Sequence, residues 1–122
     1  MIDTPAALRT YFEMWNERDL ARAFELLNEA VTDDVLFVDP RDHHEGRAAM
    51  EHNVRRFNRA FQTARISFAS GVDGHHDRFR YAWHIHVDGE LLLEGFDVAT
   101  LAADGRIERV DGFFGPLPAL PE

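Results

Sequence analysis

The segment GFDVATLAADGRIERVDGFFG, residues 95–115, decides the fold, because it predicts two β-strands joined by a tight turn. Ala103-Asp104-Gly105 has residue types that favour a turn, and strand-like runs over 91–102 and 106–114 lie on either side of it. Asp97 stands inside the first run. Aspartate is depleted in strands, and a buried carboxylate is costly unless it is paired, hydrogen-bonded or protonated. Asp97 therefore has either a structural role or a role in the chemistry of a functional site.

Two more strands are expected before this segment. Residues 65–70 and 78–87 have strand-like patterns, and Asp88-Gly89 after the second of them favours a hairpin turn. Together with residues 95–115, they predict an antiparallel meander. The C-terminal residues 115–122, GPLPALPE, contain three prolines and are expected to be irregular.

The first half of the chain predicts three helices and one strand. Apolar residues recur at helical spacing after Thr4-Pro5, after Asp19 and again from about Gly46. Thr4 is expected to cap the first of these helices and Asp19 the second. The run VLFVDP, residues 35–40, is a short strand that its proline ends, and residues 41–46, RDHHEG, are expected to form a polar loop.

This order of elements predicts an α+β fold, with three N-terminal helices on one face of a curved, mostly antiparallel sheet. The 122 residues suffice for one domain and are too few for two, so residues 1–122 are expected to form a single domain with an irregular tail at 115–122.

Composition excludes several classes of function. The net charge of −9 disfavours nucleic acid and anionic lipid as partners. No apolar run approaches the roughly 18 residues that a membrane span needs, and the N-terminal MIDTPAALRT lacks the pattern of a secretory signal. The absence of cysteine excludes disulfides and thiolate metal sites. We therefore expect a cytoplasmic protein that binds neither nucleic acid nor membranes.

Strand alternation separates the two faces of the sheet. One face carries Tyr81, Trp83, Ile85, Asp97, Ala99, Val110, Gly112 and Phe114, and the first strand places Val35, Phe37 and Asp39 together. If the helices cover this face, Asp39 and Asp97 point into one apolar interior. Such surroundings raise the pKa of a carboxyl group.

The opposite face predicts a partner subunit. His84 and His86 lie on it with Phe96, Val98 and Phe113, so the strand 91–102 is apolar on both sides. A strand buried on both faces of a one-layer sheet indicates that a second copy covers it, and we expect a homodimer. Two histidines at this spacing can chelate a metal, but no metal-ligand motif surrounds them, and no metal site is expected.

Three segments carry a resemblance to a known family: YFEMWNERDL at 11–20, DDVLFVDP at 33–40 with the later Glu45-Gly46, and residues 95–115. The chain is similar to the nuclear transport factor 2-like superfamily, specifically to its SnoaL-like and ketosteroid-isomerase-like members. The resemblance implies the cystatin-like cone of that superfamily, in which a bent sheet wraps around helices and leaves a blind apolar cavity at the open end.

The resemblance also implies site residues. In ketosteroid-isomerase-like members a tyrosine on the first helix donates a hydrogen bond to the substrate, an aspartate before a proline shuttles the proton, and a protonated aspartate donates a second hydrogen bond. The matching positions here are Tyr11, Asp39 and Asp97. Structural roles without this chemistry are the alternatives: Asp39 as a turn residue before Pro40 and Tyr11 as a core residue. Asp97 is then a structural carboxylate bonded to a tyrosine of the first helix or to a backbone amide, or it faces solvent in a different register.

The sequence departs from both known catalytic sets. Val31 and Val54 stand where the isomerases carry supporting tyrosines, and Trp83 stands roughly where SnoaL-like polyketide cyclases carry a histidine. The residues expected to line a ligand pocket are Trp15, Val54, Tyr81, Trp83, Ile85, Ala99, Val110 and Phe114.

The expected function is cofactor-free acid/base isomerisation or cyclisation of a small hydrophobic carbonyl compound, in which a base near a C–H bond acts with donors at the developing oxyanion. A non-catalytic ligand-binding or interaction module is the alternative. Hydrolysis or dehydration ranks third, because the sequence indicates no inward-facing arginine.

Overall fold

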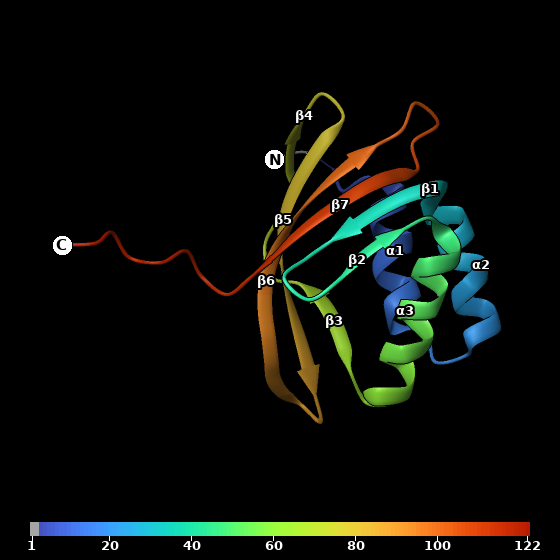
Figure 1. Ribbon diagram of the computed structural model, residues 1–122, viewed down its shortest axis with the longest axis horizontal. Coiled ribbons are helices and arrows are strands. Elements are labelled where there is room, and N and C mark those ends of the chain that lie inside the picture. Colours follow the sequence, from blue (N-terminus) through green and yellow to red (C-terminus); the bar gives the residue numbers. More distant parts are fainter. Residues whose placement is uncertain (1–2) are drawn as a thin grey trace.

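The computed structural model describes residues 3–122 (Figure 1). The helices are α1 (Ala6–Asn16), α2 (Leu20–Ala30) and α3 (Arg47–Ala60). The strands are β1 (Val31–Val38), β2 (His43–Glu45), β3 (Arg65–Phe68), β4 (Asp73–His75), β5 (Arg78–Val87), β6 (Glu90–Leu101) and β7 (Ile107–Phe114).

The sheet runs in the order β2-β1-β7-β6-β5-β3, and β4 pairs with β5. Strand β1 is parallel to β7, and the other pairs are antiparallel. The three helices lie together on one side of this bent sheet (Figure 1). The predicted α+β cone with helices on one face is therefore confirmed.

The helices form where the sequence supplies an apolar stripe and a suitable start. The Asp19 carboxylate accepts a hydrogen bond of 3.1 Å from the Ala21 N–H and caps α2, as predicted. The prediction of a Thr4 cap is wrong: Pro5 occupies the cap position of α1, and no side-chain bond caps that helix. The buried side of α1 consists of Leu8, Tyr11, Phe12, Met14 and Trp15.

Two short strands were not apparent from residue type. The prediction of a loop over 41–46 is wrong for His43–Glu45, which pair with β1 as β2. Strand β4 pairs with the start of β5 in the same way. The unpaired N–H and C=O groups at the edge of a sheet can form hydrogen bonds with a neighbouring strand whatever its side chains are. Polar side chains therefore do not prevent this pairing.

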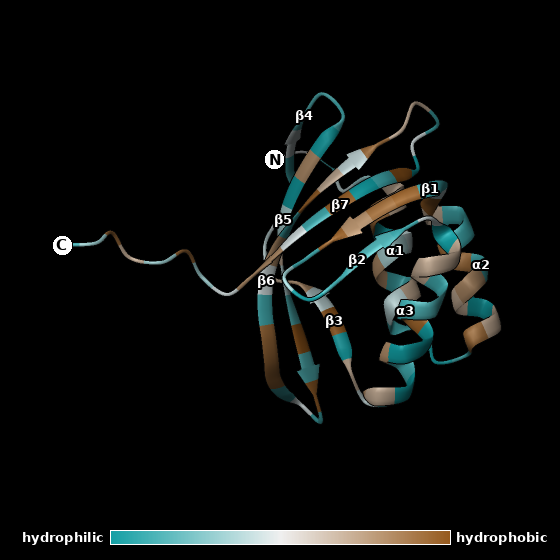
Figure 2. Cartoon of the chain, viewed as in Figure 1, coloured by the Kyte–Doolittle hydropathy of each residue, from teal (hydrophilic) through white to brown (hydrophobic). Residues whose placement is uncertain are grey.

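The core lies between the helices and the inner face of the sheet. Hydrophobic stretches run along β1 and alternate with hydrophilic ones along β5 and β7 (Figure 2). Val31, Ile107, Leu27 and Ala99 are fully buried there, with 0% of each residue exposed. The inner face that strand alternation predicts is thus the face that the helices cover.

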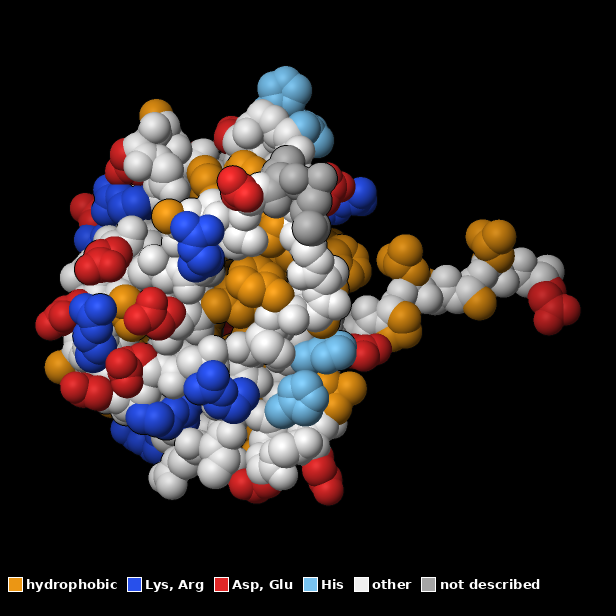
Figure 3. All heavy atoms as spheres, turned by 180° about the vertical axis from the view of Figure 1, so that it is seen from behind, with side chains coloured by type: hydrophobic (Ala, Val, Ile, Leu, Met, Phe, Trp, Pro, Cys, Tyr) orange, Lys and Arg blue, Asp and Glu red, His pale blue; other side chains and the backbone are white. Residues whose placement is uncertain are grey.

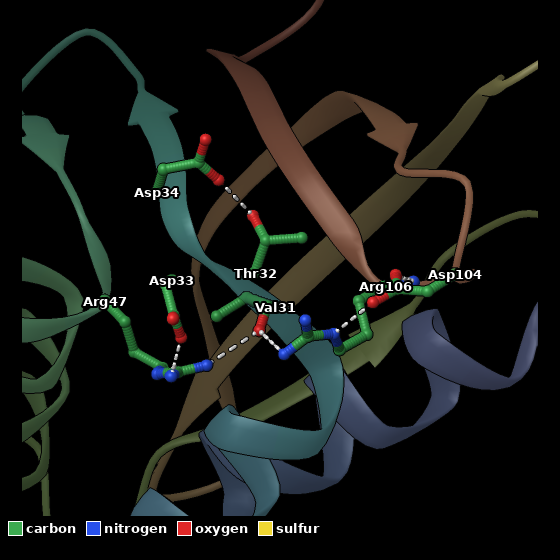
Figure 4. A network of polar contacts seen from close by, with 7 residues as sticks. All are labelled: Val31, Thr32, Asp33, Asp34, Arg47, Asp104 and Arg106. Atoms are coloured by element: carbon green, nitrogen blue, oxygen red, sulfur yellow. Dashed lines mark hydrogen bonds and ion pairs between the residues drawn. The ribbon is translucent and has the colours of Figure 1, made fainter.

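The start of β1 is fixed by two arginines (Figure 4). The carbonyl oxygen of Val31 accepts hydrogen bonds from Arg47 of α3 at 3.1 Å and from Arg106, just before β7, at 3.4 Å. Arg47 also pairs with Asp33, and Arg106 with Asp104 at 2.8 Å. This Val31 clamp joins the start of β1 to α3 and to the residue before β7.

The outer face of the sheet keeps an apolar patch. Phe96 and Phe113 stack with ring centroids 5.1 Å apart, and 51% of Phe113 is exposed. The tail after β7 leads away from the sheet, and hydrophobic side chains stand out along it in Figure 3. Leu117 and Leu120 of this tail are exposed.

Candidate functional site

A cavity of about 270 Å³ lies between the helices and the inner face of the sheet. All three residues predicted to be catalytic line it: Tyr11 from α1, Asp39 after β1 and Asp97 from β6. Four of the predicted pocket residues also line it, namely Trp15, Trp83, Ile85 and Phe114. The topology thus brings together polar groups from three distant parts of the sequence.

The other four predicted pocket residues do not line the cavity. Val54, Tyr81, Ala99 and Val110 are buried in the core, each with at most 3% exposed. Strand alternation identifies the inner face correctly but does not say how far along that face the helices fill the space. Tyr81 still contributes to the site, because it contacts Asp97 from the side of the core.

The cavity is also lined by residues outside the predicted pocket set. Its polar additions are Arg41, Asp42 and Asn53, and Phe57 and Leu92 are among the apolar ones. Arg41 and Leu92 are exposed, so the cavity reaches the surface between them. Arg41 lines the cavity at its exposed rim and does not point into the core. It lies in the segment predicted as a polar loop, where no strand or helix periodicity indicates which way a side chain points.

The Asp97 carboxylate is held by two donors. The Trp83 indole N–H donates to Oδ1 at 2.9 Å, and the Tyr81 hydroxyl donates to Oδ2 at 3.1 Å. All three residues lie on the inner face of neighbouring strands β5 and β6, where Tyr81 is paired directly with Asp97. Asp97 is 8% exposed, so these bonds offset part of its desolvation.

Burial raises the pKa of Asp97 from 3.8 to about 6. The hydrogen bonds from Trp83 and Tyr81 lower this pKa, and the charges of Asp39 and Asp111 raise it further. The ionised form therefore predominates at pH 7. A carboxyl group with a pKa this close to neutral can accept a proton as well as donate one, so both the neutral donor that the resemblance implies and a base are compatible with this position.

The Tyr11 hydroxyl stays protonated. Burial and then the charge of Asp97 raise its pKa far above the usual value, against a lowering contribution from Trp15. The ring packs edge-on against Trp15, with centroids 6.1 Å apart. Among the described residues, none accepts a hydrogen bond from this hydroxyl, and it is not sealed from the cavity. Tyr11 is therefore available as a donor to a bound molecule.

Asp39 has a structural role as well as a place in the cavity. Its Oδ1 accepts hydrogen bonds from the backbone N–H groups of Arg41 at 2.9 Å and Asp42 at 2.8 Å. This is the turn that residue type predicts before and after Pro40. Its second oxygen makes no hydrogen bond to the described residues.

Gly112 allows the two aspartates to approach. It pairs with Asp97 across β6 and β7. A Cβ at this position would lie 2.8 Å from Asp97 Oδ1 and 3.2 Å from the Cβ of Asp39. Any side chain here would displace one of the carboxyl groups. Strand alternation predicts Gly112 on the inner face but does not reveal this contact.

The departures from the known catalytic sets have structural consequences. Val31 and Val54 are buried in the core, with 0% and 2% exposed, and supply no hydroxyl group. The indole of Trp83 contacts Asp97 where the cyclases are expected to use a histidine. Asp97 is thus supported from β5, and Tyr11 is supported by aromatic packing.

The described part of the chain was compared with two further features, a metal-binding cluster and a membrane-spanning helix, and has neither. Residues 3–122 contain no group of three His, Asp or Glu side chains arranged to hold a metal ion. None of the helices described is both long and apolar enough to cross a membrane.

Comparisons with known proteins agree with this fold. The family model described as SnoaL-like domain matches residues 8–110. No curated protein matches the chain significantly. Among solved structures, a proposed isomerase of the SnoaL-like family from Agrobacterium tumefaciens is 31% identical, and 90% of this chain aligns with 95% of that one at a TM-score of 0.84.

Two further structures are similar. A nuclear transport factor 2-like protein of unknown function from Exiguobacterium is 25% identical over 92% of this chain and 100% of its own, with a TM-score of 0.76. A proposed polyketide cyclase from Sinorhizobium meliloti is 18% identical over 90% of this chain and 95% of its own, with a TM-score of 0.73, and shows the shared fold alone. The chain belongs to the SnoaL-like family, within the nuclear transport factor 2-like proteins.

Proposed function

We propose that the protein catalyses cofactor-free acid/base chemistry on a small hydrophobic carbonyl compound, with Asp97 as the general base and Tyr11 as the hydrogen-bond donor. One observation carries this proposal: a carboxylate with a pKa of about 6 and a protonated tyrosine line the same largely apolar cavity. A base is most effective when its pKa lies near the working pH, and this value meets that condition.

In the proposed reaction, Asp97 takes a proton from the carbon next to the carbonyl group. The C–H electron pair forms the enolate, whose oxygen accepts a hydrogen bond from Tyr11. In isomerisation, Asp97 then returns the proton to a different carbon. In aldol-type cyclisation, the enolate carbon bonds to the carbon of a second carbonyl group, whose π electron pair moves to its oxygen, and the resulting alkoxide takes the proton back from Asp97. Trp83 and Tyr81 hold the carboxylate in place through the cycle.

The experiment measures the first step alone. Wild-type protein is incubated in D₂O with a panel of β,γ-enones and aliphatic ketones, and ¹H NMR follows exchange of the protons next to the carbonyl group. We expect exchange above the buffer rate, reduced about 10²- to 10⁴-fold in Asp97→Asn. Asp39→Asn tests the second aspartate in the same assay. Exchange that is unchanged in both variants contradicts the acid/base assignment and favours a non-catalytic ligand-binding module.

A hydrolase or dehydratase is the second candidate, and Arg41 favours it. This arginine lines the cavity together with Asp39 and Asp42, so a carboxylate and a guanidinium are available to orient a water molecule. Hydrolysis of an epoxide substrate by the wild-type protein, and loss of this hydrolysis in Arg41→Met, would support this reaction over enolate chemistry.

We also propose that the protein forms a homodimer through the outer face of the sheet. The stacked pair Phe96 and Phe113 supports this proposal, because Phe113 remains 51% exposed although it is paired with Phe96 within the sheet. A cytoplasmic location and the absence of a nucleic-acid partner stay predictions from composition.

A further inference from the structure

Asn53 is a buried amide that faces the cavity. It lies on the inner side of α3, 6% of it is exposed, and it is one of the residues that line the cavity. Polar side chains at such burial ordinarily use all their hydrogen-bonding groups, so each group of this amide has to be accounted for.

The orientation of the Asn53 amide is fixed by Arg56. The Arg56 Nη2 group donates to the Asn53 Oδ1 atom at 3.0 Å. A guanidinium has donors only, so the oxygen of the amide faces it and the NH₂ group faces away. Arg56 is held in turn by the Asp42 carboxylate at 2.8 Å, and His44 lies 3.5 Å from that carboxylate.

The NH₂ group of Asn53 has no acceptor among the described residues. Within residues 3–122, the one fully buried side-chain nitrogen or oxygen without a partner is Nε2 of His44. The Asn53 nitrogen therefore borders open space, and the cavity is the space that Asn53 lines. An oriented donor without a partner, in a largely apolar cavity, is suited to bind an oxygen atom of a ligand.

We infer that the Asn53 NH₂ group binds a second oxygen of the ligand, and that the ligand is an apolar molecule with two carbonyl groups. The inference rests on the proposed function for the first carbonyl group, which Tyr11 and Asp97 bind and activate. The second oxygen belongs to a neutral group rather than to a carboxylate, because three acidic residues, Asp39, Asp42 and Asp97, line the cavity against one basic residue, Arg41. This excess of negative charge disfavours an anion.

The same donor makes the cavity selective. A ligand with a single carbonyl group leaves the Asn53 NH₂ group without a partner, and an unsatisfied donor in an apolar site lowers affinity. We expect a dicarbonyl compound to bind about three- to tenfold more tightly than the matching ketone, the range that one neutral hydrogen bond supports.

Ligand binding is measurable through the two tryptophans of the chain, Trp15 and Trp83, because both line the cavity. The probes are decane-2,4-dione, decane-2,5-dione and decane-2,6-dione, which separate the carbonyl groups by different lengths, and decan-2-one, which lacks the second oxygen. Quenching of intrinsic fluorescence gives a Kd for each probe. We expect at least one dione to bind wild type about three- to tenfold more tightly than decan-2-one.

Asn53→Asp keeps the oxygen that accepts from Arg56 and removes the NH₂ donor, so it should abolish the preference for the dione. Asn28→Asp on the exposed surface of α2 is the matched control with the same change of charge, and it should retain the preference. Asn53→Leu is the second variant, and thermal unfolding checks that each variant is folded.

The outcomes separate the inference from the proposed function. Equal Kd values for all diones and decan-2-one in wild type, or a preference that survives in both Asn53 variants, overturns the inference. Failure of decan-2-one to bind, or binding that Tyr11→Phe and Asp97→Asn leave unchanged, overturns the proposed function and the inference with it. A preference that only the Asn53 variants lose supports both.

Discussion

The Oδ1 atom of Asp97 occupies the space that a side chain on Gly112 would need, since a Cβ at position 112 would lie 2.8 Å from that oxygen. The indole of Trp83 holds the same oxygen at 2.9 Å, so the carboxylate cannot move aside without losing this bond. Gly112→Ala should therefore lower the free energy of unfolding by about 1–3 kcal/mol, as overpacking in a core does. Urea denaturation of wild type and Gly112→Ala measures this difference in the free energy of unfolding.

The Asp97→Ala background is the control for this prediction. Once the carboxylate is gone, the added methyl group at position 112 has room, and its cost should fall by about 1 kcal/mol or more. An equal cost in both backgrounds would mean that the contact with Asp39 or with the backbone, and not with Asp97, limits position 112.

Asp97 should give the stability a distinct dependence on pH. Its pKa is about 6 in the folded protein against 3.8 for an unperturbed aspartate, so the folded state binds the proton more tightly than the unfolded state. The contribution of protonated Asp97 is complete below about pH 3.8 and is lost as pH rises to about 6. Unfolding free energies of wild type and Asp97→Asn should therefore diverge in favour of Asn by about 2–3 kcal/mol between these limits. A constant difference would contradict the raised pKa.

The same ionisation should control activity. Exchange or turnover should rise with pH through an apparent pKa of about 6, because only the carboxylate form of Asp97 accepts the proton. Trp83→Phe removes the donor that lowers this pKa most, so the midpoint of the profile should move to higher pH. Tyr81→Phe should move it in the same direction by less. A profile that does not move in either variant would exclude Asp97 as the titrating group.

Tyr11→Phe should reduce turnover far more than stability. No described side chain accepts from its hydroxyl, so its loss leaves no buried partner unsatisfied, and Tm should change little. Loss of one donor to an oxyanion costs about 10²-fold or more in kcat. Steady-state kinetics with parallel thermal unfolding separate the two effects. A large fall in Tm with unchanged kcat would make Tyr11 a core residue only.

Phe113→Glu should separate the proposed dimer. A charge on the exposed side of the Phe96–Phe113 pair opposes burial of this face against a second copy. Light scattering at micromolar concentration should give twice the chain mass of 14.0 kDa for wild type and that mass for the variant. Glu108→Gln, on an exposed site of β7, is the control and should remain dimeric. A wild-type protein at the single-chain mass would contradict the dimer.

Strand periodicity correctly predicted which side chains of the long strands face the helices. It did not predict which of these side chains line the cavity and which are covered by the helices. The strand Arg78–Val87 has the predicted bounds, and its alternation correctly puts Trp83 on the face of Asp97. The same alternation includes Ala99 and Val110, which the helices cover completely. Side-chain phase is a local property of the backbone, whereas the distance between helix and sheet depends on the packing of the whole chain.

The rim of the cavity was beyond prediction for a related reason. Arg41 lies in the turn at Asp39, outside any strand or helix. Leu92 lies in the predicted strand 91–102, but the register of β5 and β6 shifts beside it, so simple alternation does not give its direction. Both line the same cavity, which depends on how the whole chain packs and not on local sequence. Residue type alone also does not reveal that two hydrogen bonds oppose the effect of burial on the pKa of Asp97.

The Val31 clamp and the turn at Asp39 lie at opposite ends of β1, which separates the part of the strand that secures the fold from the part that meets a ligand. Rim positions such as Arg41 and Leu92 are exposed, and substitutions there cost little stability. This division makes the chain a favourable starting point for laboratory evolution: libraries at the rim can change which molecules enter while the clamp preserves folding.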